Sequence, residues 1–96
     1  MKRAARIDAN QTAVVEALRA AGATVHSLAA VGNGVPDLLV GFNGQTLLFE
    51  VKDGDKSPSR QKLTAHQKQW HENWQGGVLQ IVDGPASALL ILEILA

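Results

Sequence analysis

The sequence has 96 residues, 46% of them hydrophobic and 19% charged, which is typical of a globular protein and not of a disordered or fibrous one. It contains no cysteine, so disulfides, thiolate metal sites and thiol nucleophiles are excluded. Nine Lys and Arg residues balance nine Asp and Glu residues, and this net charge permits a nucleic-acid partner without arguing for one. At this length we expect one domain, residues 1–96, with one hydrophobic core.

Nothing in the sequence indicates a membrane partner. The basic residues at the N-terminus are not followed by the apolar run that a signal peptide needs. The longest apolar run, residues 88–92, is much shorter than a membrane span. We therefore expect a soluble, cytoplasmic protein.

The first predicted helix covers residues 10–21, where apolar side chains recur at helical spacing and Gly22 is placed to end the helix. Residues 24–28 have the composition of a strand. The small, glycine-containing residues 29–34 then predict a loop.

A β-hairpin is predicted around Asn43-Gly44, the strongest short hairpin signal that a sequence offers. This turn joins predicted strands at residues 35–42 and 45–52. With a two-residue turn, every facing pair is fixed, and Asp37 faces Glu50 across the two strands. Facing side chains have Cβ atoms roughly 4.5–5.5 Å apart, which is close enough for two carboxylates to hold one divalent ion.

The second half of the chain adds a loop, a helix, a strand and a final helix. Residues 53–62 have no apolar side chain to bury and predict an exposed loop. Thr64 is placed to cap a helix reaching about residue 75, and a strand at 78–82 and a helix at 86–95 follow. The element order α-β-β-β-α-β-α predicts an α/β fold in which a small mixed sheet is flanked by helices.

The two facing acids predict a metal site. Mg²⁺ prefers oxygen ligands and keeps several waters, so Asp37, Glu50 and the Val51 carbonyl are sufficient ligands from the protein. Such an ion polarises a phosphoryl oxygen and activates a bound water, and Lys52 would orient that water or neutralise developing charge. This is the chemistry of metal-dependent phosphodiester cleavage.

Pro36-Asp37, the hairpin and Glu50-Val51-Lys52 together resemble the core of the PD-(D/E)XK nuclease superfamily. The following run from Leu63 to Trp70 and the small size resemble most closely the stand-alone VRR-NUC domains of phage and bacterial genomes. The resemblance covers nearly the whole chain and implies a restriction-endonuclease-like core.

The same resemblance implies an endo- or exonuclease that uses Mg²⁺ or Mn²⁺ and no organic cofactor. Its expected substrate is duplex, flap or four-way-junction DNA, cut in a bacterial or phage-infected cell, and its expected state is a homodimer.

The role of Gln67 has two interpretations. Thr64 and Gln67 have the spacing of a capping box, in which Gln67 bonds back to the helix start. The family resemblance instead implies that Gln67 points into the active site as a catalytic residue.

Many relatives carry an acid on the first helix that completes the metal site. Here the only acid within that helix is Glu16, which lies about 200° around the helix from Val14 and so faces solvent. Gln11 lies about 60° and Asn10 about −40° from Val14, so both flank the buried face and either could reach the site. We prefer Gln11 over Glu16 as the first-helix contributor.

The remaining polar and aromatic residues have simpler interpretations. The basic residues of the exposed loop, Lys56, Arg60 and Lys62, are expected to contact the DNA backbone. Trp70 and Trp74 share a helical face and are interpreted as core residues, with base stacking as the alternative. The three histidines lack metal-site spacing and are interpreted as surface or structural residues.

The last predicted helix is apolar around much of its circumference, which favours a homodimer contact over burial within its own domain. Two functions compete with the nuclease. One is a nucleic-acid-binding module that has kept the fold but does not cut. The other is a protein that only mediates interaction or assembly. The neutral net charge and the apolar last helix favour this alternative.

Overall fold

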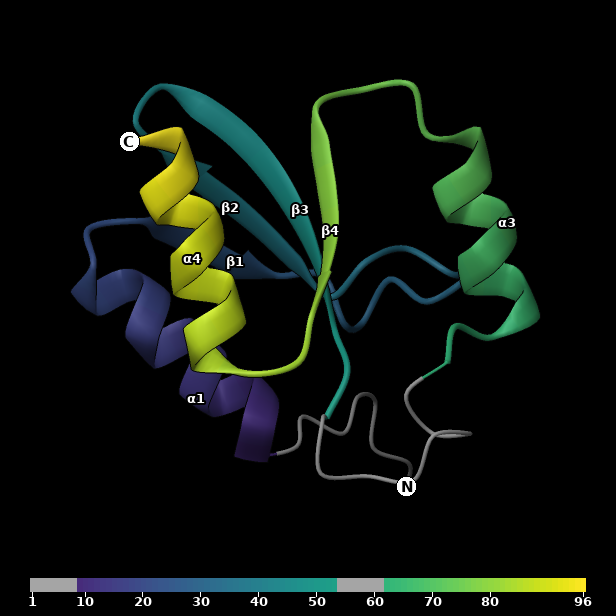
Figure 1. Cartoon of the computed structure of the whole chain (residues 1–96). Helices are drawn as coiled ribbons and strands as arrows, with labels where there is room; N and C mark the ends of the chain where they lie inside the picture. Colours follow the sequence, from purple (N-terminus) through teal and green to yellow (C-terminus); the bar gives the residue numbers. More distant parts are fainter. Residues whose placement is uncertain (1–8, 54–61) are drawn as a thin grey trace.

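A four-stranded mixed sheet organises the fold (Figure 1). The structure is a computed structural model that describes residues 9–53 and 62–96. The strands lie in chain order, antiparallel from β1 to β3, with β4 parallel to β3: β1 (Thr24–Ser27), β2 (Leu38–Phe42), β3 (Gln45–Val51) and β4 (Val78–Val82). The helices are α1 (Ala9–Ala20), α3 (Ala65–Asn73) and α4 (Pro85–Leu95). The predicted fold class and element order are confirmed.

The hairpin between β2 and β3 turns at Asn43 and Gly44, which have φ values of 52° and 77°. Two successive left-handed residues make the turn type whose twist matches that of paired strands. The ladder runs in the predicted register, from Phe42 opposite Gln45 to Leu38 opposite Phe49. Strand β2 starts later than predicted, so Asp37 directly precedes the ladder.

The core lies between α1, α4 and one face of the sheet. Alternate residues of β2 and β3 point into it and are fully buried, as are residues of both helices: Leu38, Val40, Leu47, Phe49, Val14, Leu18, Ala88 and Leu92. The intervening positions, Asp37, Leu39, Leu48 and Glu50, belong to the opposite face. Helices α1 and α4 therefore pack on the apolar face, and the start of α1 reaches the polar end of the hairpin at Lys52.

Helix α3 stands apart from α1 and α4 (Figure 1). It contributes no buried residue, and Trp74 is 38% exposed. Trp70 and Trp74 instead stack on each other, with ring centroids 5.0 Å apart. The interpretation of both tryptophans as core residues was therefore wrong, because α3 does not pack on the sheet face that forms the core.

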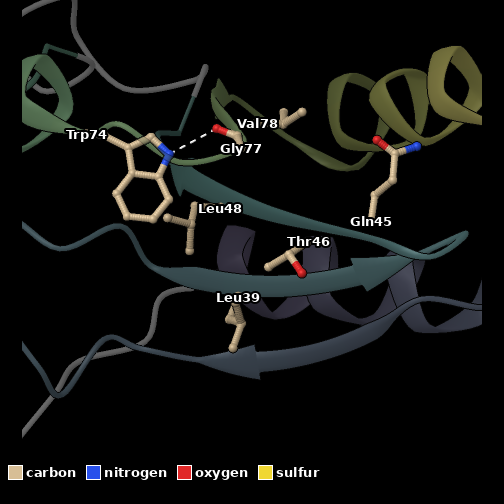
Figure 2. A pocket seen from close by; sticks show the side chains of 7 residues that line it. All are labelled: Leu39, Gln45, Thr46, Leu48, Trp74, Gly77 and Val78. Carbon is tan, nitrogen blue, oxygen red and sulfur yellow. Dashed lines mark hydrogen bonds between the residues drawn. The ribbon is translucent and has the colours of Figure 1, made fainter.

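The open face of the sheet has a pocket of about 380 Å³ beside Trp74 (Figure 2). The Trp74 indole Nε1 donates a hydrogen bond to the Gly77 carbonyl at 2.9 Å, which holds the ring at the rim. The lining residues are Leu39, Gln45, Thr46, Leu48, Trp74, Gly77 and Val78.

Helix α4 is buried along only one side. Ala88 and Leu92 are buried in the core, whereas Leu90 is 54% and Ile94 is 70% exposed. Its apolar outer side is therefore open in this chain. None of the described helices is long and apolar enough to cross a membrane.

Candidate active site

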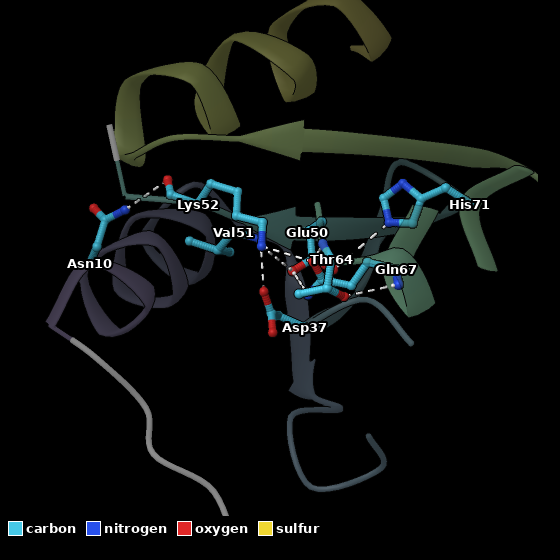
Figure 3. Close-up of polar contacts among 8 residues, drawn as sticks. All are labelled: Asn10, Asp37, Glu50, Val51, Lys52, Thr64, Gln67 and His71. Atoms are coloured by element: carbon cyan, nitrogen blue, oxygen red, sulfur yellow. Dashed lines mark hydrogen bonds and ion pairs between the residues drawn. The ribbon is translucent and has the colours of Figure 1, made fainter. Parts of the chain in front are cut away.

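The two acids meet where β3 ends (Figure 3). Glu50 is the penultimate residue of β3 and is 1% exposed. Asp37 precedes β2, and its Oδ2 accepts a hydrogen bond of 2.8 Å from the Val51 amide. This bond anchors the Asp37 side chain to the strand that carries Glu50, so the hairpin register determines the geometry of the pair.

The Glu50 carboxyl group is stabilised in its neutral form. Its pKa is raised from 4.5 to about 8, mainly by burial and then by the charge of Asp37 and a hydrogen bond with Asp37. Lys52 acts in the opposite direction but does not overcome burial. Near neutral pH, the neutral form of Glu50 is therefore favoured. Its proton relieves the repulsion between the two acids, as a bound cation also would.

Gln67 connects the start of α3 to Glu50 of β3 and to Lys52, the residue that follows this strand. Its Oε1 accepts hydrogen bonds of 2.9 Å from the Thr64 amide and 2.9 Å from Lys52 Nζ. Its Nε2 donates to Glu50 Oε2 at 3.0 Å. Thr64 Oγ1 accepts from the Gln67 amide, which completes a capping box. The predicted capping box is present, and the same amide group also contacts Glu50 and Lys52, whereas a catalytic role for Gln67 stays a prediction.

Lys52 is held at its backbone and at its side chain. Its amide donates to the Val82 carbonyl at 2.8 Å, and its carbonyl accepts from Asn10 Nδ2 at 3.3 Å. Its Nζ lies 4.0 Å from Glu50 Oε2, and the side chain is 14% exposed. The Lys52 ammonium group is thus held beside the acids by a side chain that is mostly buried.

Gly34 lets the loop before Asp37 approach α3. A Cβ at this position would lie 2.6 Å from the His66 carbonyl carbon and 3.0 Å from the Gln67 amide nitrogen. Gly34 also has a φ of 83°, a conformation that other residues rarely adopt. The absence of a side chain here brings the first turn of α3, and with it Gln67, within reach of the acids.

His71 is a site residue that the sequence interpretation missed. Its Nε2 lies 3.8 Å from Glu50 Oε1, and its side chain is 13% exposed. Burial lowers its pKa, and Lys52 lowers it further. The sequence did contain a signal for this position. His71 follows Gln67 by four residues, so the two side chains share one face of the helix.

The first helix presents Gln11 and not Glu16 to the interior. Gln11 is 7% exposed, whereas Glu16 is exposed, as the helical spacing predicted. Asn10 bridges the residues that follow β3 and β4, since its Nδ2 approaches the Asp83 carbonyl at 3.2 Å as well as the Lys52 carbonyl.

The predicted DNA-contacting residues are only partly described. Lys62 is exposed shortly before α3, and Lys56 and Arg60 lie outside the described residues.

The donor set fits a hard divalent cation. Two carboxylates stand side by side, and Glu50 Oε1 is buried with no hydrogen-bond partner. Within residues 9–53 and 62–96, no three acidic, histidine or cysteine side chains are grouped closely enough to hold an ion. Asp37, Glu50, the Val51 carbonyl and waters match the sparse protein ligation that Mg²⁺ accepts.

One solved structure resembles the chain over most of its length. It is described as a VRR_NUC domain, is 30% identical and superposes with a TM-score of 0.64. The match covers 86% of this chain and 89% of that chain. No family profile and no curated protein matches the sequence.

The raised pKa of Glu50 predicts how stability depends on pH without divalent cations. Between pH 4.5 and about 8, the folded chain holds a proton that the unfolded chain has lost. Stability contributed by this group is therefore complete below pH 4.5 and is lost as the pH rises towards 8. Glu50→Gln should remove this loss and be the more stable protein at pH 8.

Urea unfolding in EDTA at pH 5 and pH 8, followed by circular dichroism, measures this difference. His71, whose pKa is lowered, contributes the opposite slope in both proteins. Equal pH slopes for wild type and Glu50→Gln would show that Glu50 is not protonated in the fold.

Gly34→Ala should displace the start of α3 from the acids, because its Cβ would overlap the backbone of His66. The two tryptophans of the chain both lie at the C-terminal end of this helix, at positions 70 and 74, so intrinsic fluorescence reports on it. We expect a shifted emission maximum with circular dichroism close to wild type. Gly41→Ala is the matched control, since its Cβ would meet only ordinary contact at 3.8 Å. Identical spectra for all three proteins would contradict the close approach.

Proposed function

Because this chain belongs to the VRR-NUC family of nuclease domains, we propose that it is a metal-dependent DNA nuclease acting at the Asp37–Glu50 site. The observation that carries the proposal is the pair of acids itself, in which Glu50 is 1% exposed and Asp37 is held beside it by the Val51 amide. A buried pair of acids is costly unless a cation neutralises it. Membership of a nuclease family supports DNA as the substrate.

Asp37, Glu50 and the Val51 carbonyl would hold Mg²⁺ or Mn²⁺. The chemistry that such an ion supplies is polarisation of a phosphoryl oxygen and a lower pKa for bound water. The Asp37 bond to the Val51 amide and the Gln67 bond to Glu50 Oε2 keep both carboxylates oriented before substrate arrives.

Lys52 stabilises negative charge that grows on the phosphate during cleavage. Its ammonium group is fixed by Gln67 Oε1 at 2.9 Å and lies on the same side as Glu50. A charge held in place before the reaction needs no reorganisation during it, which is the largest source of catalysis in many enzymes. Gln67 thus assists by fixing the donor and one acid together.

Contacts to the DNA backbone come from the basic residues after Lys52. Lys62 is exposed close to the start of α3, and Lys56 and Arg60 precede it in the sequence. Phosphate contacts of this kind set affinity and its salt dependence, not sequence preference.

A homodimer of this chain would bring two cleavage sites together. Such an arrangement would favour flap or four-way-junction DNA as the substrate. The open side of α4, with Leu90 and Ile94, supports a homodimer contact because it exposes large apolar side chains. A homodimer would offer two cleavage sites to one branched substrate.

The direct test is cleavage of linear duplex, flapped and four-way-junction DNA with Mg²⁺, with Mn²⁺ and with EDTA. We expect cleavage with either ion and none with EDTA. Glu50→Gln and Lys52→Ala should each lower the rate by about 10²-fold or more. Glu16→Gln is the matched control and should cut as wild type does, because Glu16 is exposed on the outer side of α1.

Absence of cleavage by the wild-type protein on every substrate would contradict the proposal. Binding without cleavage would instead identify a non-cutting nucleic-acid-binding module, which the amide at Gln11 in place of an acid favours. A rate unchanged in Glu50→Gln would place the cleavage chemistry elsewhere in the chain.

A further inference from the structure

His71 and Glu50 face each other with unsatisfied polar atoms. His71 Nε2 and Glu50 Oε1 are 3.8 Å apart, and neither has a hydrogen-bond partner within the described part of the chain. Their side chains are only 13% and 2% exposed, so water does not readily replace a partner. Leaving a buried donor or acceptor unpaired costs free energy, because the group has lost its bonds to water. Two such atoms side by side therefore indicate a hydrogen bond that these two side chains are placed to form.

The two groups are chemically complementary. A neutral imidazole with its hydrogen on Nε2 is a donor, and an ionised carboxylate is an acceptor at both oxygens. Their separation exceeds the roughly 2.7–3.2 Å of a hydrogen bond, so a small movement of either side chain is needed to form one.

Helix α3 presents one donor to each oxygen of Glu50. Gln67 Nε2 donates to Oε2 at 3.0 Å, and His71 stands one turn further along the helix, facing Oε1 (Figure 3). The capping box at Thr64 fixes where this face begins. Two donors from one rigid helix would fix the plane of the carboxylate, which one donor alone leaves free to rotate.

We propose that His71 is a positioning residue, whose Nε2–H bonds to Glu50 Oε1 and holds this carboxylate in the orientation that a divalent ion requires. This inference rests on the proposed function. His71 acts through Glu50 and does not share an ion with both acids, because no group of three such side chains in residues 9–53 and 62–96 is close enough. Partners that hydrogen-bond to a metal ligand typically change metal affinity by about 10–100-fold.

Calorimetric titration with Mn²⁺, in the absence of DNA, tests the proposal. His71→Phe should bind Mn²⁺ about 10–100-fold more weakly than wild type, because it fills the space without a donor. His71→Gln should recover most of the affinity, since its amide nitrogen occupies the place of Nε2. His66→Phe is the matched control on the same helix and should bind as wild type does, because His66 is exposed. Melting temperatures in EDTA verify that each variant is folded.

Wild-type Mn²⁺ affinity in His71→Phe would overturn the proposal, and so would equal weakness of His71→Gln and His71→Phe. If His71→Phe does not fold, His71→Asn takes its place with the same expected results, because its amide is too short to reach Oε1. Glu50→Gln separates the two hypotheses. Mn²⁺ binding that is lost in Glu50→Gln but unchanged in His71→Phe overturns only the role of His71. Binding that is unchanged in Glu50→Gln overturns the metal site itself.

Discussion

Burial of the Glu50 carboxyl group beside Asp37 sets the requirements that the surrounding residues meet. Taking an acid out of water and placing it next to another acid favours the neutral form of Glu50, and its pKa is raised to about 8. Two neighbours offset part of that cost. Gln67 donates a hydrogen bond to Glu50, and Lys52 places a positive charge nearby. A divalent cation would offset the rest, so the burial that makes two adjacent acids costly is also what would favour a bound metal ion.

The site is built from two parts that are distant in the sequence. The hairpin provides Asp37, Glu50 and Lys52, and its register is fixed by the turn at Asn43-Gly44. Helix α3 provides Gln67 and His71, and α3 can approach because Gly34 has no side chain against its first turn. Helix α3 leaves the core to the other two helices and the sheet, so its place is set mainly by these polar and backbone contacts.

How far the sequence predicts this arrangement depends on the range of each interaction. The hairpin, its register and the exposed position of Glu16 follow from local turn chemistry and helical spacing, and these predictions agree with the structure. The capping box at Gln67 is equally local, but its second role in contacting Glu50 needs the loop and helix to meet. The tryptophans were misplaced and His71 was missed for one reason: a helical face is visible in sequence, whereas the surface that it meets is not.

The central claim is that the Asp37–Glu50 pair exchanges a proton for a divalent cation. Calorimetric titration with Mn²⁺ at pH 7, in buffers with different ionisation enthalpies, gives the number of protons released per ion bound. With a pKa of about 8 for Glu50, the wild-type protein should release close to one proton for each ion that it binds. Ion binding by the wild-type protein without proton release would contradict the claim.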